Sequence, residues 1–175
     1  MYKKRLQEQS GFTLIEMLIV VIMLGILAML IIPQISVSTA DANLNTLQTN
    51  LASMRNAIEL YYHQHNQVYP GARKNDGTAG PSDVESATAF LEQLTQYTDM
   101  NGDCQTTSDA THIYGPYVKS TVLPTNPFNN QNDVKCNVAM ADITDRTADG
   151  TTAWFCHPTT GVFFANDGGA GHNVL

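Results

Sequence analysis

Glu16 is a carboxylate inside an apolar run, and its chemistry needs an explanation. No other charge follows it in the run as far as Ile32. A carboxylate at the centre of a bilayer costs about 2.5–3.5 kcal/mol on insertion scales, so a sequence that keeps one there is expected to provide a partner for it. We therefore predict that Glu16 pairs with a cation. The alternative is that Glu16 reaches the membrane surface or caps the N-terminus of its own helix, where the dipole favours an anion.

The histidines offer no metal site, because none of their spacings matches a metal-ligand pattern. His63 and His65 lie near a predicted helix end and are expected to be solvated. The others are His112, His157 and His172. The chain has no Gly-x-Ser-x-Gly elbow, no phosphate-binding loop and no His-Glu-x-x-His motif. We therefore expect no enzymatic activity, no catalytic residue and no cofactor.

A short acidic segment, Asp99-Met-Asn101-Gly-Asp103, begins like a calcium-binding loop, with oxygen-bearing side chains at alternate positions. The rest of the pattern fails, because Cys104 replaces the glycine and Ala110 stands where the bidentate acid belongs. The favoured interpretation is a solvated acidic loop, and the sequence assigns no metal ligand.

Three cysteines, Cys104, Cys136 and Cys156, have spacings that match no zinc pattern. In an oxidising compartment they allow one disulfide and leave one thiol. We favour a bond between Cys136 and Cys156, because both lie in predicted strands that can be neighbours, whereas Cys104 lies in a predicted loop. The other pairings stay open, since connectivity cannot be read from a sequence.

The charges are distributed unevenly along the chain. Lys3, Lys4 and Arg5 precede the apolar run, most of the acids follow it, and the formal net charge is −7. This asymmetry follows the positive-inside rule, which places the N-terminus in the cytoplasm and the rest of the chain across the membrane. The acidic exported part argues against nucleic acid as a partner. A chain of 175 residues has room for one domain and an anchor.

The apolar run from Phe12 to Ile32 is long enough to cross a membrane. As a helix that rises 1.5 Å per residue, it is about 31 Å long, close to the thickness of a hydrocarbon core. A secretory signal has a shorter apolar region, of roughly 7–15 residues, and a cleavage site between small residues. Ser38-Thr-Ala40 and Ala40-Asp-Ala42 are sites of that kind. A cleaved signal is therefore the alternative to a retained helix.

The hexapeptide Gly11-Phe-Thr-Leu-Ile-Glu16, with its basic leader and the apolar helix behind it, closely resembles the type IV pilin and type II secretion pseudopilin family. The resemblance implies that a prepilin peptidase cuts between Gly11 and Phe12 and methylates the new amine of Phe12. It also implies that Glu16 neutralises the Phe12 amine of an adjacent subunit during assembly. Two charges that are each costly in lipid then become less costly together, which favours the filament over the membrane monomer.

Pro33 follows the apolar run and is expected to kink the helix, because a proline there removes a backbone donor. The resemblance implies the same bend. Beyond it, apolar residues at steps of three and four predict an amphipathic continuation over 34–66: Leu44, Leu47, Leu51, Met54, Ile58 and Tyr61. We expect this stripe to pack on the chain's own globular domain. A coiled-coil dimer is the alternative, although the repeat covers fewer than about three heptads.

Turn signals at Tyr69-Pro70-Gly71 are expected to end the long helix near His65. Ser82 and Glu85 then have capping-box spacing ahead of a short amphipathic helix that reaches about Tyr97.

Strand patterns come last in the sequence. Apolar and polar residues alternate from Val134 to Met140, and residues 152–157 and 161–166 flank a turn as a predicted hairpin. The predicted fold class is α+β: a long N-terminal helix, a short extra helix and a small antiparallel sheet packed on the long helix.

The C-terminal half resembles the major pseudopilins of type II secretion. The resemblance rests on Gly115-Pro-Tyr117, on Leu123-Pro-Thr-Asn-Pro127 and on Trp154 ahead of a Thr-Gly turn. It implies calcium in a C-terminal loop as a possible ligand, but no ligand set can be assigned from it. The residues considered are Asp142, Asp145, Asp149 and Asp167.

These observations divide the chain into a leader (1–11), a membrane and filament-core helix (12–33), its amphipathic continuation (34–66) and a pilin-like domain (67–175). The resemblance implies a subunit of a homo-oligomeric filament, first anchored in the inner membrane by a single helix with its C-terminal domain in the periplasm, then in a periplasmic or extracellular filament. The implied partners are prepilin peptidase, an inner-membrane assembly platform and minor pseudopilins.

A type II major pseudopilin is preferred to the pilin of a surface pilus. A third hypothesis is an anchored or secreted binding module that uses aromatic side chains as contacts, although such side chains more often form the core of so small a domain. The aromatic residues considered are Tyr114, Tyr117, Trp154 and Phe163.

Overall fold

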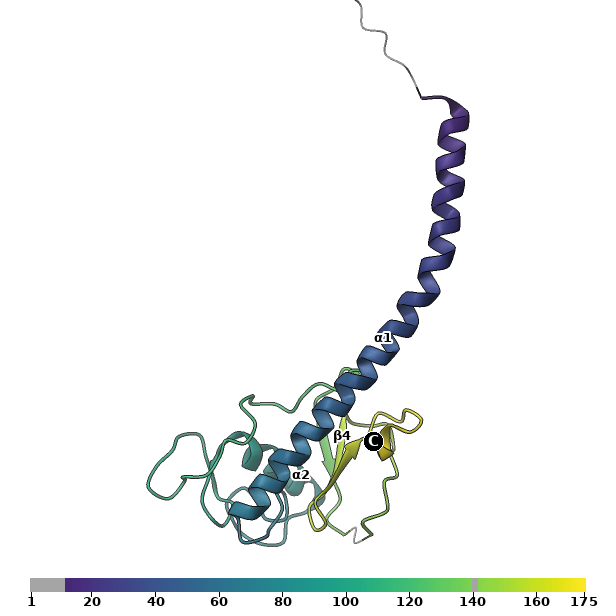
Figure 1. Ribbon diagram of the computed structural model, residues 1–175. Coiled ribbons are helices and arrows are strands. Elements are labelled where there is room, and N and C mark those ends of the chain that lie inside the picture. The colour runs from purple at the N-terminus through teal and green to yellow at the C-terminus, as the bar shows by residue number, and fades with distance from the viewer. Residues whose placement is uncertain (1–11, 140–141) are drawn as a thin grey trace, which may run out of the picture. The chain divides into compact units, whose positions relative to one another are not determined.

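The computed structural model describes residues 12–139 and 142–175, without the side chains of residues 30–38. The chain forms two units, Met1–Ala42 and Asn43–Leu175. Helix α1 (Leu14–Gln64) begins in the first unit and ends in the second (Figure 1). The long N-terminal helix of the predicted α+β fold is therefore confirmed.

The end of α1 follows from its local backbone. Asn66 and Gln67 adopt left-handed conformations, with φ of 54° and 61°, and the Gln67 N–H donates to the Tyr62 carbonyl. Such a residue pair stops a helix while satisfying one of its last carbonyls. The predicted end near His65 is confirmed.

The second helix, α2 (Asp83–Thr95), begins at a capping box. Ser82 accepts from the Glu85 N–H, and the Glu85 carboxylate accepts from the Ser82 N–H at 2.8 Å. These bonds to Ser82, together with the ion pair to Lys74, lower the pKa of Glu85 to about 2. The short helix predicted from the Ser82 and Glu85 spacing is confirmed.

The main sheet has three strands in the order β3-β4-β5: β3 (Val134–Cys136), β4 (Trp154–His157) and β5 (Val162–Ala165). Strands β4 and β5 form the predicted antiparallel hairpin, whereas β3 joins β4 in parallel. A two-stranded ribbon pairs β1 (Tyr97–Thr98) with β2 (Cys104–Gln105), and η1 (His172–Val174) is a short 3-10 helix.

Strand β3 is shorter than its sequence pattern predicts. It ends at Cys136, because the Val138 N–H turns away to the Asp83 carboxylate at 2.8 Å. Met140, the last residue of the predicted strand, lies outside the described residues. Alternation alone therefore overestimated this strand.

The core lies where the amphipathic part of α1 meets α2 and the sheet. The stripe of α1 is buried as predicted from Leu47 on, whereas Leu44 is only partly buried. The buried members are each at most 2% exposed: Leu47, Leu51, Met54, Ile58 and Tyr61. It packs against Phe90, Trp154 and Phe163 in one cluster. The stripe is thus occupied by the chain's own domain, which disfavours the coiled-coil alternative.

His65 is buried, at 1% exposure, so the expectation that it is solvated was wrong; His63 is exposed as expected. The ring of His65 stacks on Tyr61 at 3.7 Å, and its nitrogens bond to the Tyr61 carbonyl and the Thr98 hydroxyl. Burial lowers the pKa of His65, which keeps the imidazole neutral within this aromatic cluster.

Candidate functional site

The N-terminus of α1 is closed by a capping box between Thr13 and Glu16. The Thr13 hydroxyl accepts from the Glu16 N–H at 3.3 Å, and Glu16 Oε2 accepts from the Thr13 N–H at 2.7 Å. The Thr13 hydroxyl also donates to Glu16 Oε2 at 2.7 Å. This arrangement satisfies helix donors that otherwise lack a partner, so Glu16 does cap its own helix.

The cap leaves half of the carboxylate available. Both bonds to the Glu16 side chain end on Oε2, and Oε1 has no hydrogen bond to any residue that the structure describes. The cap uses only Thr13 and Glu16, so it does not depend on residues 1–11. One oxygen can therefore hold the helix end while the other accepts a second donor.

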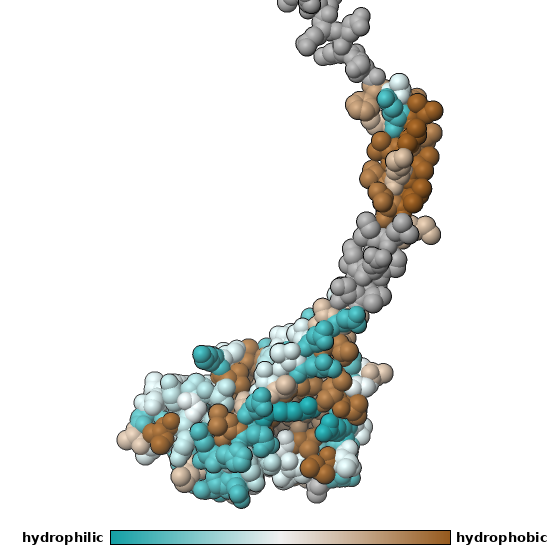
Figure 2. All heavy atoms as spheres, in the orientation of Figure 1, coloured by the Kyte–Doolittle hydropathy of each residue, from teal (hydrophilic) through white to brown (hydrophobic). Residues whose placement is uncertain are grey.

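The side chains around this cap are apolar and exposed. Phe12 is 78% exposed and Leu14 is 90% exposed, and the described residues of α1 up to Met29 are exposed as well. Figure 2 shows hydrophobic side chains over this part of the helix. Such a large apolar surface marks a site of interaction with lipid or with other proteins.

Within the part of the chain whose side chains are described, no helix reaches the length and hydropathy of a membrane-spanning segment. The predicted span of 12–33 includes residues whose side chains lie outside that part.

The structure does not test two of the predicted site residues, Gly11 and Pro33. Gly11 lies outside the described residues. Pro33 lies within α1, whose helical assignment is continuous across it, but its side chain is not described. Cleavage after Gly11 and a bend at Pro33 therefore stay predictions.

Cys136 and Cys156 form a disulfide, the pair preferred from the sequence. They face each other in register across the parallel strands β3 and β4, with Cα atoms 4.6 Å apart, and both are buried. Cys104 is free and half-buried. Burial, with Glu92 and two aspartates nearby, raises the pKa of its thiol to about 12, so this thiol is unreactive at neutral pH.

The aspartates considered for calcium are engaged locally. Asp142, Asp145 and Asp149 each accept from the backbone and hydroxyl of a threonine two residues later. Asp167 accepts from His172, Gly169 and Asn126. Among the described residues no group of three or more His, Cys, Asp and Glu side chains is placed to hold a metal ion. Calcium in a C-terminal loop therefore stays a prediction without an assigned set of ligands.

The loop of Asp99 to Asp103 is likewise organised by its own backbone. The Asp99 carboxylate accepts from the N–H groups of Asn101 and Asp103 at 2.7 and 2.9 Å. Burial opposes its ionisation, but these bonds prevail and lower the pKa of Asp99.

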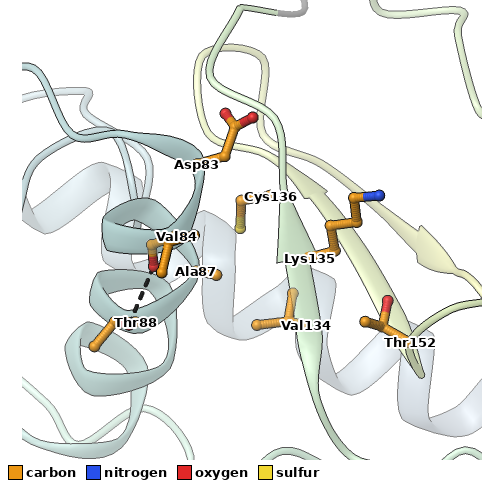
Figure 3. Close-up of a pocket in the computed structure, with 8 residues that line it drawn as sticks. All are labelled: Asp83, Val84, Ala87, Thr88, Val134, Lys135, Cys136 and Thr152. Atoms are coloured by element: carbon orange, nitrogen blue, oxygen red, sulfur yellow. Dashed lines mark hydrogen bonds between the residues drawn. The ribbon is translucent and has the colours of Figure 1, made fainter.

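An apolar groove of about 350 Å³ lies between α2 and β3 (Figure 3). Val84, Ala87 and Val134 form its apolar lining, and Figure 3 shows Asp83 and Lys135 at its margin. Lys135 is paired with Asp149 at 2.6 Å. The sequence reasoning did not anticipate this groove, because it depends on how α2 packs beside the edge of the sheet.

Arg55 is a structural residue that the sequence reasoning missed. Its guanidinium donates to the main-chain oxygens of Phe163 at 3.0 Å and Leu175 at 2.6 Å, and so links α1 to β5 and to the segment that ends at Leu175. Its position between apolar residues of the stripe was the only signal in the sequence.

Comparison with known proteins places these features in a family context. The prokaryotic N-terminal methylation motif matches residues 6–32. The chain is 36% identical over 67 residues to the type II secretion system core protein G of Vibrio cholerae, which covers 38% of this chain and 45% of that protein. It is 33% identical over 81 residues to the protein of that name from Aeromonas hydrophila, covering 43% and 56% of the two chains.

A fimbrial protein of Neisseria meningitidis is 34% identical over 77 residues, which cover 44% of this chain and 45% of that protein. The chain thus spans about half the length of the curated relatives it matches. No solved structure matches it significantly. The chain therefore carries the prokaryotic N-terminal methylation motif, and its resemblance to the type IV pilin and type II pseudopilin family is confirmed.

Proposed function

We propose that this chain is the structural subunit of a pilin-like filament, with the role of a type II secretion major pseudopilin. The observation that carries the proposal is the methylation motif over residues 6–32. It includes the end of the leader and the start of α1, whose N-terminus is capped and whose apolar side chains are exposed. Among the described residues of the α+β domain behind it, we assign no catalytic group. The role that we propose is structural.

Processing creates the cation that Glu16 needs. Hydrolysis of the peptide bond between Gly11 and Phe12 releases the leader and leaves an amine on Phe12, to which a methyl group is then added. That amine lies four residues before Glu16. A cation is disfavoured at a helix N-terminus, where the dipole is positive, so it gains by meeting a carboxylate of another subunit.

The free oxygen of Glu16 is suited to that contact. Oε2 stays on Thr13 and holds the side chain in place, while Oε1 accepts from the Phe12 amine of a neighbouring copy. In lipid each charge alone is costly, and a desolvated pair with its remaining hydrogen bonds made is less so. We propose that this difference drives subunits from the membrane into the filament.

The proposed location follows from the same steps. The apolar helix holds the unassembled subunit in the inner membrane, and the acidic domain lies in the periplasm. There an oxidising environment permits the bond between Cys136 and Cys156. We propose prepilin peptidase, an assembly platform in the inner membrane and minor pseudopilins as partners.

N-terminal sequencing of the mature protein tests the processing step. We expect N-methylphenylalanine, derived from Phe12, as the first residue. An intact Met1, or a start near Asp41 or Asn43, would contradict the proposal and would favour an unprocessed anchor or a cleaved signal.

A surface type IV pilus is the second candidate, favoured by the similarity to the fimbrial protein. Filament length separates the two, because a long extracellular fibre at native expression indicates a pilus and a short periplasmic one a pseudopilus. The binding-module hypothesis is weakened, because two of its four aromatic residues, Trp154 and Phe163, are at most 2% exposed, while Tyr114 and Tyr117 are partly exposed.

A further inference from the structure

A second cleft, with a more polar lining than the groove beside α2, lies within the C-terminal unit on the α1 side of the β4–β5 hairpin. Its volume is about 280 Å³, and its polar lining includes Arg55 and Glu59 from α1, Arg146 from the loop before β4 and Thr160 from the hairpin turn. Tyr69 forms part of its wall. The proposed contact between Glu16 and Phe12 does not involve this cleft.

Two arginines line this cleft, and no side-chain carboxylate of the described residues forms an ion pair with either guanidinium. Arg55 is half-buried and donates to the main-chain oxygens of Phe163 and Leu175, and no described residue accepts a hydrogen bond from the Arg146 side chain. Burial, and then the nearby charge of Arg146, lower the pKa of Arg55. Two cations held together in this way gain by binding an anion.

The cleft also contains an unused hydrogen-bonding group. The Thr160 hydroxyl is buried and has no hydrogen-bond partner among the described residues. A buried hydroxyl without a partner is costly, so a ligand oxygen that bonds to it recovers that cost. Because Thr160 lines the same cleft as both arginines, one anion can serve all three groups.

The wall of the cleft depends on a glycine at the hairpin turn. Gly161 has φ of +73°, and a Cβ atom there would lie 2.3 Å from the Tyr69 ring. The glycine therefore lets the Tyr69 ring, which lines the cleft, pack against the hairpin turn.

We propose that this cleft is an anion-binding site for a carboxylate group, held by Arg146, Arg55 and Thr160. Glu59, which also lines the cleft, is the one acidic side chain in this lining and opposes the anion. The carboxylate comes either from a free small acid or from an acidic side chain of a second copy. The second source rests on the proposed function, and the site itself does not.

Malonate titrated calorimetrically into the full-length protein in detergent micelles, against sodium chloride of equal ionic strength, tests the site. We expect malonate to bind and chloride not to compete at that concentration. Arg146→Gln should weaken malonate binding at least tenfold, since it removes a charge-assisted bond. Glu59→Gln should strengthen it several-fold. Lys119→Gln removes a charge from an exposed residue outside the cleft and should leave binding unchanged.

Equal responses to malonate and chloride, or unchanged malonate binding by Arg146→Gln, would overturn the proposal. Malonate binding to assembled filaments then shows whether the carboxylate comes from a free acid or from a second copy. If a neighbouring copy supplies the carboxylate, filaments exclude malonate and Arg146→Gln yields fewer filaments than Lys119→Gln. If the ligand is a free acid, filaments and micelles bind malonate equally. A chain that never assembles would refute the proposed function but not the malonate site.

Discussion

Replacing Glu16 by glutamine separates its two roles, because glutamine can keep the helix cap but carries no charge. The Glu16 side chain accepts from the Thr13 N–H and hydroxyl at 2.7 Å each. Glutamine occupies the same position in capping boxes and offers a carbonyl oxygen to both donors. The cap, worth about 0.5–2 kcal/mol, should therefore survive in Glu16→Gln and be lost in Glu16→Ala.

The charge pair should not survive either substitution. Removing one partner of a desolvated pair leaves the other charge uncompensated, at a cost of about 3–5 kcal/mol. At about 1.4 kcal/mol for each factor of ten, incorporation into filaments should fall roughly 100-fold to 4,000-fold. Because the charge pair outweighs the cap, we expect Glu16→Gln to lose nearly as much incorporation as Glu16→Ala.

Sedimentation of sheared filaments, with immunoblotting of filament and membrane fractions, measures incorporation. Mass spectrometry of the membrane fraction shows whether Phe12 is still processed, which we expect for both variants. Thr13→Val is the control, since it removes the hydroxyl of the cap but keeps the backbone donor and the Glu16 charge. Its loss should be limited to the cap energy. Normal filaments from Glu16→Gln would show that Glu16 acts as a cap alone.

Three further predictions concern the C-terminal unit. Leu51→Ala should destabilise it by about 2–5 kcal/mol in urea unfolding, because Leu51 is 1% exposed in the core; an unchanged midpoint would contradict that packing. Replacing both Cys136 and Cys156 by serine should cost about 3 kcal/mol, since the bond closes a 20-residue separation, and equal stability of the oxidised and serine forms would oppose this. His157→Phe should stabilise the domain by about 1 kcal/mol, because neither nitrogen of this buried ring has a partner among the described residues. Burial lowers the pKa of His157, so the wild type should lose stability as pH falls below about 6.5 and the variant should lose less; parallel pH profiles would refute this.

Local patterns predicted the helical elements well. The apolar stripe of α1 and the capping box of α2 depend on neighbours three or four residues apart, so the sequence contains most of what determines them. The hairpin of β4 and β5 was predictable for the same reason, since its turn lies between the two strands.

Features that depend on distant contacts were not predictable in this way. His65 is polar and near a helix end, but Thr98 and the ring of Tyr114 enclose it from a segment about 33 to 49 residues further on. The parallel pairing of β3 likewise depends on a long connection to β4, and β3 ends early because α2 supplies Asp83. The two arginines that line the second cleft come together only after folding, since they lie 91 residues apart in sequence.

The sequence pattern at the N-terminus of α1 supports two interpretations of Glu16. The spacing of Thr13 and Glu16 is that of a capping box, and the position of Glu16 in an apolar run is that of a paired charge. The structure shows that the cap occupies one oxygen and leaves the other without a partner among the described residues. The two roles are therefore compatible within one side chain.

A cryo-electron microscopy map of the assembled filament, at a resolution that shows side chains, examines the pairing itself. We predict that Glu16 Oε1 lies within about 4 Å of the Phe12 nitrogen of a neighbouring subunit, an ion-pair distance, while Oε2 stays on Thr13. A map in which the Glu16 carboxylate contacts only its own Thr13, with every Phe12 amine elsewhere, would contradict the account.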